Sequence, residues 1–315
     1  MSATRARLIL NPAAGSDQAL ANAALLNEKL SQRFGPIEIV LSLGSGDCEA
    51  AARRAVEDGC DVLFVGGGDG TLNEAVNGVA SVPGGLKRIT FGLIPLGTGN
   101  DFAQALGLPT DVDRAIGILT GVGSVAVDIG RLNKRYFVNV SGGGFIAEVS
   151  EAVTPQMKSI AGRLAYLVGG AQTLLDFEPV GVTLHAEPGG EHVTTDVYAF
   201  AVCNSRMIGG GRLIAPYAII DDGLLDLCLI DAMPTLEFVA LLRRVAGGDH
   251  IEDPRVRYLR ASRATIELDR PILVNTDGEV LEASRCEYEI LPRAGRFIGA
   301  NPPFAGAPES TAQNE

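Results

Sequence analysis

Short apolar runs alternate with helical stretches from residue 7 to about residue 121, and this alternation restricts the fold more than any other feature of the chain. The apolar runs are RLIL, IEIVL, DVLFV and ITFGLIP, and each is followed by a helical pattern. Continuously apolar strands that are separated by helices form parallel sheets covered on both faces. We therefore predict a doubly wound α/β domain in residues 1–122.

The pattern changes after residue 122. The segments SVAVDIGRL and RYFVNVSG predict a hairpin around Asn133, and later segments such as LLDLCLID and CEYEIL have β-branched residues or two-residue alternation. Residues 123–292 are therefore predicted to form an antiparallel β-sandwich, with the chain end at 293–300 as a candidate to return to the first domain. Helical patterns interrupt this part at 161–177 and 234–247. The polar, proline-rich residues 301–315 are predicted to be a disordered tail.

Charge and composition exclude several classes of function. With 38 acidic and 26 basic residues the formal net charge is -12, so we expect no binding of nucleic acid through phosphate neutralisation. The five cysteines form no C-x-x-C pair and the three histidines have no i, i+4 partner, which argues against a zinc site or a disulfide framework. The first apolar stretch is broken by Asn11 and Pro12, unlike a signal peptide, so a cytoplasmic location is expected.

Arg131, Lys134 and Arg135 form the densest small basic cluster in the first half of the chain. We interpret them as the solvated tip of the predicted hairpin. Because the overall field repels anions, contact with an anionic membrane would need a local patch or apolar contacts.

A glycine-rich loop follows the third apolar run, in VGGGDGTLNEAVNG at residues 65–78. Thr71 and Glu74 have the spacing of a capping box, so the loop is predicted to join a strand to a helix. Bare backbone N–H groups at a helix N-terminus suit a phosphate. A tight turn with positive φ angles explains one or two of these glycines, but not four in five positions. Asp69 would repel a phosphate unless a cation lies between them, so it indicates a metal bridge or hydrogen bonding.

Two further strand ends carry loops of the same kind. The segment LILNPAAGS contains Asn11, Pro12 and Gly15, and FGLIPLGTGNDFAQAL contains the run from Gly97 to Asp101. The chain has neither a Walker A motif nor a G-x-G-x-x-G motif with a ribose-binding acid. Three such loops at one edge of a parallel sheet predict a ligand site there.

These motifs resemble a known family. NPAAG, GGGDGTLNEAVNG and PLGTGNDFA are similar to the nucleotide-binding motifs of the diacylglycerol kinase catalytic-domain family, especially the bacterial YegS-like lipid kinases. The resemblance continues at GGGRLIAPYAIIDDGLLDLCLI and VNTDGEVLE and covers roughly residues 7–298. NAD kinases and phosphofructokinases share the G-G-D-G-T loop alone, whereas LNEAVNG and GTGNDFA favour the lipid kinases.

The resemblance implies an ATP- and Mg²⁺-dependent transfer of phosphate to a lipid hydroxyl, in a cleft between the two domains. Asp69 and Asp101 would organise metal and water at the phosphates. Ser42 stands where the family commonly has a threonine. The nucleotide-binding residues that the resemblance implies are Asn11, Pro12, Ala13, Ala14, Gly15, Ser42, Gly66, Gly67, Gly68, Asp69, Gly70, Thr71, Leu72, Thr98, Asn100 and Asp101.

Two acidic turns follow in the second half. Asp221 and Asp222 fit either a hard cation or an ordinary Asp-Gly turn, and the resemblance implies a supporting metal on Asp222 with the carbonyls of Ile219 and Leu224. The turn in VNTDGEV would, by the same resemblance, supply the acceptor of the lipid hydroxyl's proton. Asp277 and Glu279 are both candidates, and the sequence does not choose between them.

One departure from the family is Ser16, where members often carry a lysine. Lys158 or Arg163 would then assist charge neutralisation, unless both are surface charges. The alternatives are an NAD kinase and a nucleotide-binding regulator without chemistry. The expected partner is a lipid, reached by transient contact at the inner membrane surface. The oligomeric state is open, with a homodimer as one option.

Overall fold

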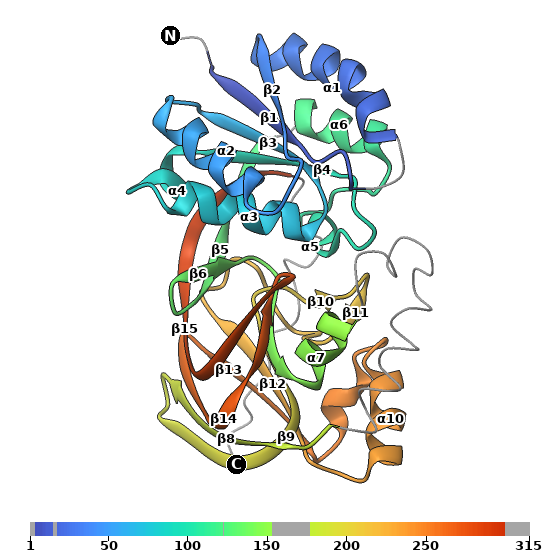
Figure 1. The fold of residues 1–315 in the computed structure, drawn as a ribbon, viewed down its shortest axis with the longest axis vertical. Helices are drawn as coiled ribbons and strands as arrows, with labels where there is room; N and C mark the ends of the chain where they lie inside the picture. Colours follow the sequence, from blue (N-terminus) through green and yellow to red (C-terminus); the bar gives the residue numbers. More distant parts are fainter. Residues whose placement is uncertain (1–3, 15–17, 122, 153–176, 300–315) are drawn as a thin grey trace, which may run out of the picture.

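The computed structural model describes residues 4–14, 18–121, 123–152 and 177–299. Its first half is built on four parallel strands in the spatial order β2-β1-β3-β4 (Figure 1). Their bounds are β1 Ala6–Leu10, β2 Ile37–Leu41, β3 Val62–Gly67 and β4 Thr90–Pro95.

Helices cover both faces of this sheet because successive strand residues point to opposite sides. Leu8 and Leu10 pack with α1 (Gln18–Phe34) and α6 (Val112–Gly121), whereas Ile9 packs with the helices of the other face. Those helices are α2 (Asp47–Glu57), α3 (Asp69–Ala80), α4 (Gly85–Arg88) and α5 (Asp101–Ala105). The predicted doubly wound α/β arrangement is confirmed.

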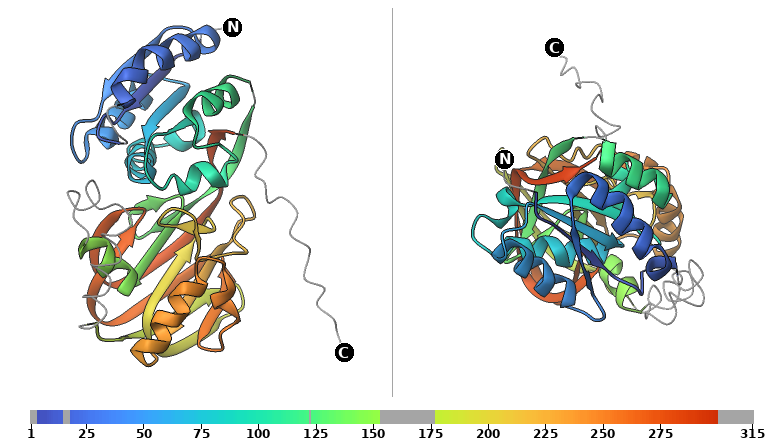
Figure 2. Two further views of the ribbon diagram at one scale, coloured as in Figure 1. Left: turned by 90° about the vertical axis from the view of Figure 1, so that its right-hand side faces the viewer. Right: turned by 90° about the horizontal axis from the view of Figure 1, so that it is seen from above.

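Antiparallel strands form the second half around a separate apolar core, as predicted (Figures 1 and 2). Asn133 has a φ of 51° in the turn of the expected hairpin. The strands are β5 Ser124–Leu132, β6 Arg135–Phe137, β7 Val140–Gly144, β8 Val180–Glu187, β9 Glu191–Cys203, β12 Leu225–Asp231, β13 Val256–Ala261, β14 Arg263–Thr276 and β15 Glu279–Ile298, with the short pair β10 Met207–Ile208 and β11 Arg212–Leu213.

Helices α7 (Phe145–Ala152) and α10 (Thr235–Arg244) pack beside these strands, and η1 (Asp249–Glu252) follows α10. The helix expected at 234–247 is therefore present as α10. The one expected at 161–177 lies outside the described residues, apart from Phe177. No helix in the described ranges has the length and apolar character needed to cross a membrane.

Strand β15 connects the two halves. It pairs with β14 in the second half, and Arg296–Ile298 pair in parallel with Thr90–Gly92 of β4. Strand β5 runs antiparallel to β15 on both sides of a register shift between Leu291 and Gly295. One sheet of 13 strands therefore continues through both halves.

Helices α2 and α3 are in close contact at Gly78, where a Cβ atom would lie 2.1 Å from the carbonyl oxygen of Glu49. We expect Gly78→Ala to lower the free energy of unfolding by about 2 kcal/mol or more, because backbone must move. Gly117→Ala is the matched control: it lies in α6 with nothing within 4 Å of the added Cβ. It should raise stability by about 0.5–1 kcal/mol. Urea denaturation measures both, and equal stabilities would contradict the close packing.

Candidate active site

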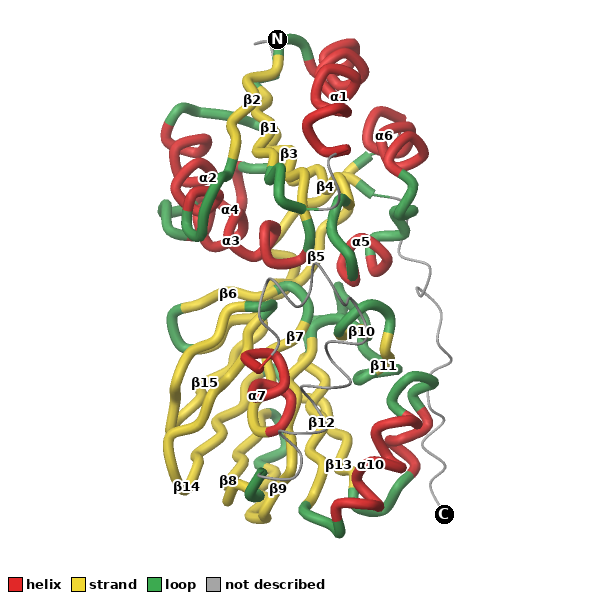
Figure 3. Tube along the Cα trace, turned by 45° about the vertical axis from the view of Figure 1, so that its right-hand side comes forward, coloured by secondary structure: helices red, strands yellow, loops and turns green. Residues whose placement is uncertain are grey.

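The carboxyl ends of β1, β3 and β4 lie side by side, so the three predicted loops meet at one edge (Figure 3). The N–H of Asn11 donates to the carbonyl of Gly66 at 2.8 Å, and that of Ser42 donates to the carbonyl of Leu10 at 2.9 Å. The Asn11 side chain accepts the N–H of Ala13 and donates to the Thr71 hydroxyl at 3.1 Å. Gly15 and Ser16 lie outside the described residues.

Close packing, rather than backbone torsion, accounts for Gly66, Gly67 and Gly68 in the second loop. None of the four glycines from Gly66 to Gly70 has a positive φ. A Cβ on Gly67 would lie 2.5 Å from the Thr71 side chain, and one on Gly97 would lie 2.4 Å from the Cα of Gly68. The backbones of the second and third loops therefore touch at a point where no side chain fits.

The predicted capping box at Thr71 and Glu74 is wrong. Helix α3 begins at Asp69 with Gly68 as its N-cap, so Thr71 already lies inside the first turn. Its hydroxyl contacts Gly67 and accepts from Asn11, which ties the first loop to the second. Thr71 therefore bonds to Asn11, which is distant in the chain, and does not form the local capping box.

Asp69 uses its carboxylate to hold the third loop. Its oxygens accept the N–H groups of Asp101 and Phe102, each at 3.1 Å, at the start of α5. The amide of Asn139 in the second half donates to Asp69 Oδ1 at 3.2 Å. The sequence indicated either a metal bridge or hydrogen bonding for Asp69, and these hydrogen bonds are present in the structure.

Asp101 reaches across to the second half. Its carboxylate accepts the N–H groups of Gly210 at 3.0 Å and Gly211 at 2.8 Å. Burial raises the pKa of this carboxyl, the Gly210 bond opposes that shift, and nearby Asp69 adds to it. A Cβ on Gly99 would lie 3.3 Å from Asp69 Oδ2 and 3.7 Å from Asp101 Oδ2. The space beside Gly99 thus faces two carboxylate oxygens, the ligand type that Mg²⁺ prefers.

The other predicted nucleotide-binding residues differ in exposure. Asn100, in the left-handed region with a φ of 53°, closes its own loop by hydrogen bonds to both backbone groups of Gly97. Thr98 is exposed at the edge, whereas Ser42 and Leu72 are buried. An ideal Cβ placed on Gly70 would lie 4.0 Å from the carbonyl oxygen of Asp277. The glycine-rich loop is therefore adjacent to the D-G-E turn of the second half.

Asp277 is a buried anchor. Its carboxylate accepts the backbone N–H groups of Val138 at 2.6 Å and Val140 at 2.8 Å, and that of Asn139. The side-chain amide of Asn73 approaches the same group at 3.3 Å. Burial raises the pKa of Asp277 to about 6, although the backbone donors lower it.

Glu279 has different surroundings. Its carboxylate pairs with Arg135, whose other terminal nitrogen lies 3.0 Å from Glu49 on α2. The side chain of Glu279 is 38% exposed. Arg135 is thus part of an ion-pair network and not the solvated hairpin tip that the sequence predicts.

The sequence reasoning also missed asparagines. Asn77 on α3 donates to and accepts from the backbone of Tyr136, and Asn73 donates to the same carbonyl. Their i, i+4 spacing places both on one face of the helix, which is the signal that could have revealed them. Asn139 joins Asp69 to Asp277 and accepts from the Ser205 hydroxyl at 2.7 Å.

The turn predicted to bind a supporting metal contains an ion pair. Asp222 Oδ1 accepts the N–H of Leu224 at 3.1 Å, and Oδ2 pairs with Arg260. Within the described ranges, no three His, Cys, Asp or Glu side chains are grouped as for a metal ion. A cation at Asp222, with the carbonyls of Ile219 and Leu224, would compete with Arg260 for this carboxylate. Lys158 and Arg163 lie outside the described residues.

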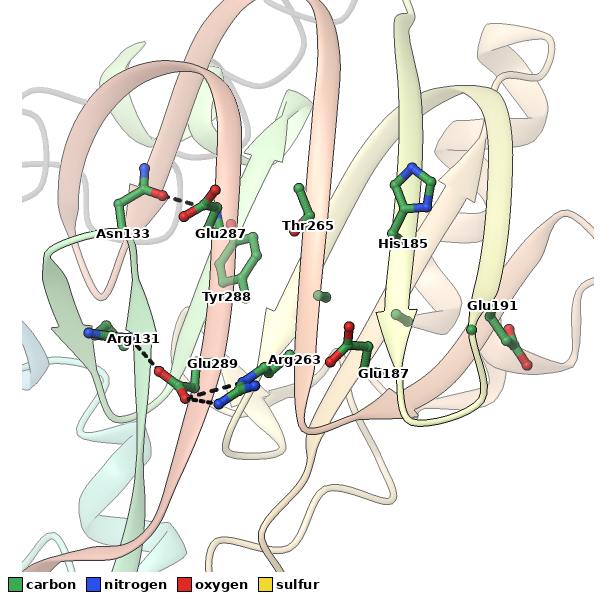
Figure 4. Close-up of a pocket in the computed structure, with 13 residues that line it drawn as sticks. Arg131, Asn133, His185, Glu187, Glu191, Arg263, Thr265, Glu287, Tyr288 and Glu289 are labelled. Carbon is green, nitrogen blue, oxygen red and sulfur yellow. Dashed lines mark hydrogen bonds and ion pairs between the residues drawn. The ribbon is translucent and has the colours of Figure 1, made fainter.

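A groove of about 530 Å³ on the second half is lined by none of the predicted site residues (Figure 4). Glu289 pairs there with both Arg131 and Arg263, across three neighbouring strands. These charged side chains make the groove a solvated surface of the sheet.

Two family models match the chain. A diacylglycerol kinase catalytic domain matches residues 5–132, and a YegS C-terminal NAD kinase beta sandwich-like domain matches residues 139–299. The chain belongs to the diacylglycerol kinase family of lipid kinases. Named relatives support this assignment and favour it over an NAD kinase.

A diacylglycerol kinase from Bacillus subtilis (strain 168) is 33% identical over 87% of this chain and 89% of its own. The "Probable lipid kinase YegS-like" of Shewanella frigidimarina (strain NCIMB 400) is 30% identical over 95% of this chain and 94% of its own. A crystal structure of a diacylglycerol kinase from Bacillus anthracis has a TM-score of 0.73 at 23% identity, covering 95% of this chain and 98% of that one. The last comparison shows a shared fold.

The different surroundings of the two acids in the D-G-E turn of this kinase can be tested through stability. In Asp277→Asn, an amide nitrogen would face a backbone N–H, which should cost about 1–3 kcal/mol of unfolding free energy. Glu279→Gln, at a half-exposed ion pair, should cost about 1 kcal/mol or less. Chemical denaturation of both variants measures the difference. A larger loss in Glu279→Gln would overturn the assignment of Asp277 as the anchor.

Proposed function

We propose that the chain is a cytoplasmic kinase that transfers the γ-phosphate of ATP to the hydroxyl of diacylglycerol while it contacts the inner membrane surface. The observation that carries the proposal is the contact between the two halves of the site. Gly70 of the glycine-rich loop lies near the backbone of Asp277 in the D-G-E turn, and Asn73 of the following helix donates to the Asp277 carboxylate at 3.3 Å. A phosphate bound by the loop would therefore lie near the acids of the turn.

ATP would be bound through backbone N–H groups of the three loops, at Asn11 to Gly15, at Gly66 to Leu72 and at Thr98. Close contact of bare backbones at Gly68 and Gly97 supports this role, because no side chain covers the loops at that point. Mg²⁺, held against Asp69 and Asp101, would neutralise charge on the phosphates. Asp69 also holds the start of α5, so it would set the position of the third loop relative to the nucleotide.

Glu279 is the better candidate for the proton acceptor. A base must have a free lone pair within hydrogen-bond reach of the hydroxyl. Backbone donors occupy both oxygens of the buried Asp277. Glu279 is partly exposed, and its pairing with Arg135 uses one oxygen. Asp277 would then shape the turn that presents Glu279.

Asp69→Asn tests the role of the loop carboxylate. We expect kcat to fall about 100-fold or more, because the amide cannot replace a charged metal ligand. Asp111→Asn is the matched control: Asp111 accepts the N–H of Arg114 at the start of α6, as Asp69 does for α5. Asp111→Asn should change stability by less than about 0.5 kcal/mol, because asparagine and aspartate cap helices about equally well. Asp69→Asn should lose about 1 kcal/mol, because its amide nitrogen would face one of the two N–H groups that the carboxylate accepts. Undiminished activity of Asp69→Asn, assayed with ATP and diacylglycerol, would contradict the mechanism.

The acceptor is tested with ATP labelled on its γ-phosphate. The panel contains diacylglycerol, monoacylglycerol, phosphatidylglycerol, ceramide and a sphingoid base in mixed micelles, and NAD in solution. We expect the label in phosphatidic acid, the product from diacylglycerol. Transfer to NAD would favour the NAD kinase alternative. Tight ATP binding without transfer to any acceptor would favour a regulator without chemistry.

A further inference from the structure

The hairpin of β5 and β6 is fixed at two places, which determines where Arg135 lies. At its tip, Asn133 exchanges hydrogen bonds with the backbone of Glu287 on β15. Along its edge, Asn77 of α3 binds both backbone groups of Tyr136. Strand β6 therefore lies against α3 of the first half (Figures 1 and 3). Arg135 extends from a backbone that both halves hold.

Arg135 divides its two terminal nitrogens between two acids. Nη1 donates to Glu49 of α2 at 3.0 Å, and Nη2 donates to Glu279 of β15. The three side chains are 31%, 35% and 38% exposed, for Arg135, Glu49 and Glu279 respectively. Although burial alone would lower the pKa of the guanidinium, its bonds to the two carboxylates raise it above the usual arginine value. The guanidinium is therefore a permanent positive charge between two carboxylates from different halves.

The pairing leaves one oxygen of Glu279 available. Arg135 contacts Oε2, and no hydrogen bond from another described residue reaches Oε1. Glu279 follows Gly278, which has a φ of 99°, and its own side chain is 38% exposed, so packing confines it little. A glutamate has three side-chain torsions, and a base that is misplaced by about 1 Å loses much of its effect. The guanidinium is the group that restricts it.

We propose that Arg135, held by Glu49, is a positioning residue that orients the carboxylate of Glu279 toward the acceptor hydroxyl. The inference rests on the proposed role of Glu279 as the proton acceptor. It makes Arg135 act through Glu279, without contact to ATP. It also makes a residue of the nucleotide-binding half, Glu49, part of the support for a base that belongs to the other half.

The test compares variants of the full chain, assayed with ATP and dioleoylglycerol in mixed micelles. Arg135→Gln should lower kcat about 30-fold, with the KM for ATP within about threefold of wild type. Arg135→Lys keeps the positive charge, so its kcat should recover to within about fivefold of wild type. The recovery should be incomplete because a lysine cannot bind both acids at once as the forked guanidinium does. Binding of ATP, measured by calorimetric titration, should be unchanged in both.

Arg131→Gln is the matched control. Arg131 lies on the same hairpin, is 40% exposed and pairs with Glu289 of β15, but belongs to the solvated groove. Its kcat should stay within about twofold of wild type, since exposed pairs contribute little. Equal kcat values for Arg135→Gln and Arg131→Gln, with Glu279→Gln inactive, would overturn the inference and leave the proposed function standing. Full activity of Glu279→Gln would overturn both the inference and the proposed role of Glu279 as the proton acceptor.

Glu49→Gln provides a second test that does not remove the arginine. It should lower kcat about fivefold, and the double variant Glu49→Gln/Arg135→Gln should be no slower than Arg135→Gln, because both act through one network. Wild-type kcat in Glu49→Gln would contradict the proposed support. If Arg135→Gln unfolds at the assay temperature, Glu49→Gln and Arg135→Lys still decide the question.

Discussion

Strand β15 has hydrogen-bond partners in both halves of the molecule, and the site depends on that continuity. The strand starts directly after the D-G-E turn and ends beside β4, whose other end leads into the GTGND loop. Ladder hydrogen bonds are directional, and a buried backbone group that loses its partner is costly. A large displacement of one half would therefore disrupt pairing along β5, β15 and β4. The sheet itself maintains the relative placement of the glycine-rich loops and the acidic turn.

Within that framework, acids are held close together away from water. Burial raises the pKa of both Asp101 and Asp277, and Asp69 contributes repulsion to each. Backbone N–H groups at Gly210, Gly211, and Val138 to Val140 compensate part of this unfavourable energy. A cation bound near such acids would relieve the remaining repulsion.

The sequence predicted those parts that local pattern determines. Alternating apolar runs and helices led to the α/β half, and Asn133 marked the hairpin, because the responsible residues are close in the chain. Prediction from the sequence failed where a side chain's interaction partner is distant in the chain. Thr71 suggested a capping box but bonds to Asn11, and Arg135 suggested a solvated tip but bonds to Glu49 and Glu279.

For the acids, sequence spacing predicted which residues lie near one another but not what each of them does. Spacing alone showed that Asp69 and Asp101 follow strands of one sheet, and the structure brings their oxygens to the same side of Gly99. The backbone donors around Asp277 come from residues 138–140, a segment with no motif that points to the D-G-E turn. Only the fold reveals that this carboxylate is enclosed.

The turn also explains why two acids only two residues apart have different environments. Asp277 has a φ of 50° and Gly278 a φ of 99°, so the chain reverses tightly between β14 and β15. At such a reversal one side chain points into the protein, where the N–H groups of 138–140 enclose it, and the next acid emerges at the start of β15 beside Arg135. The acid at the enclosed position shapes the turn, whereas the acid at the start of β15 is partly exposed and pairs with Arg135. The D-G-E spacing therefore combines a buried anchor and a partly exposed acid within three residues.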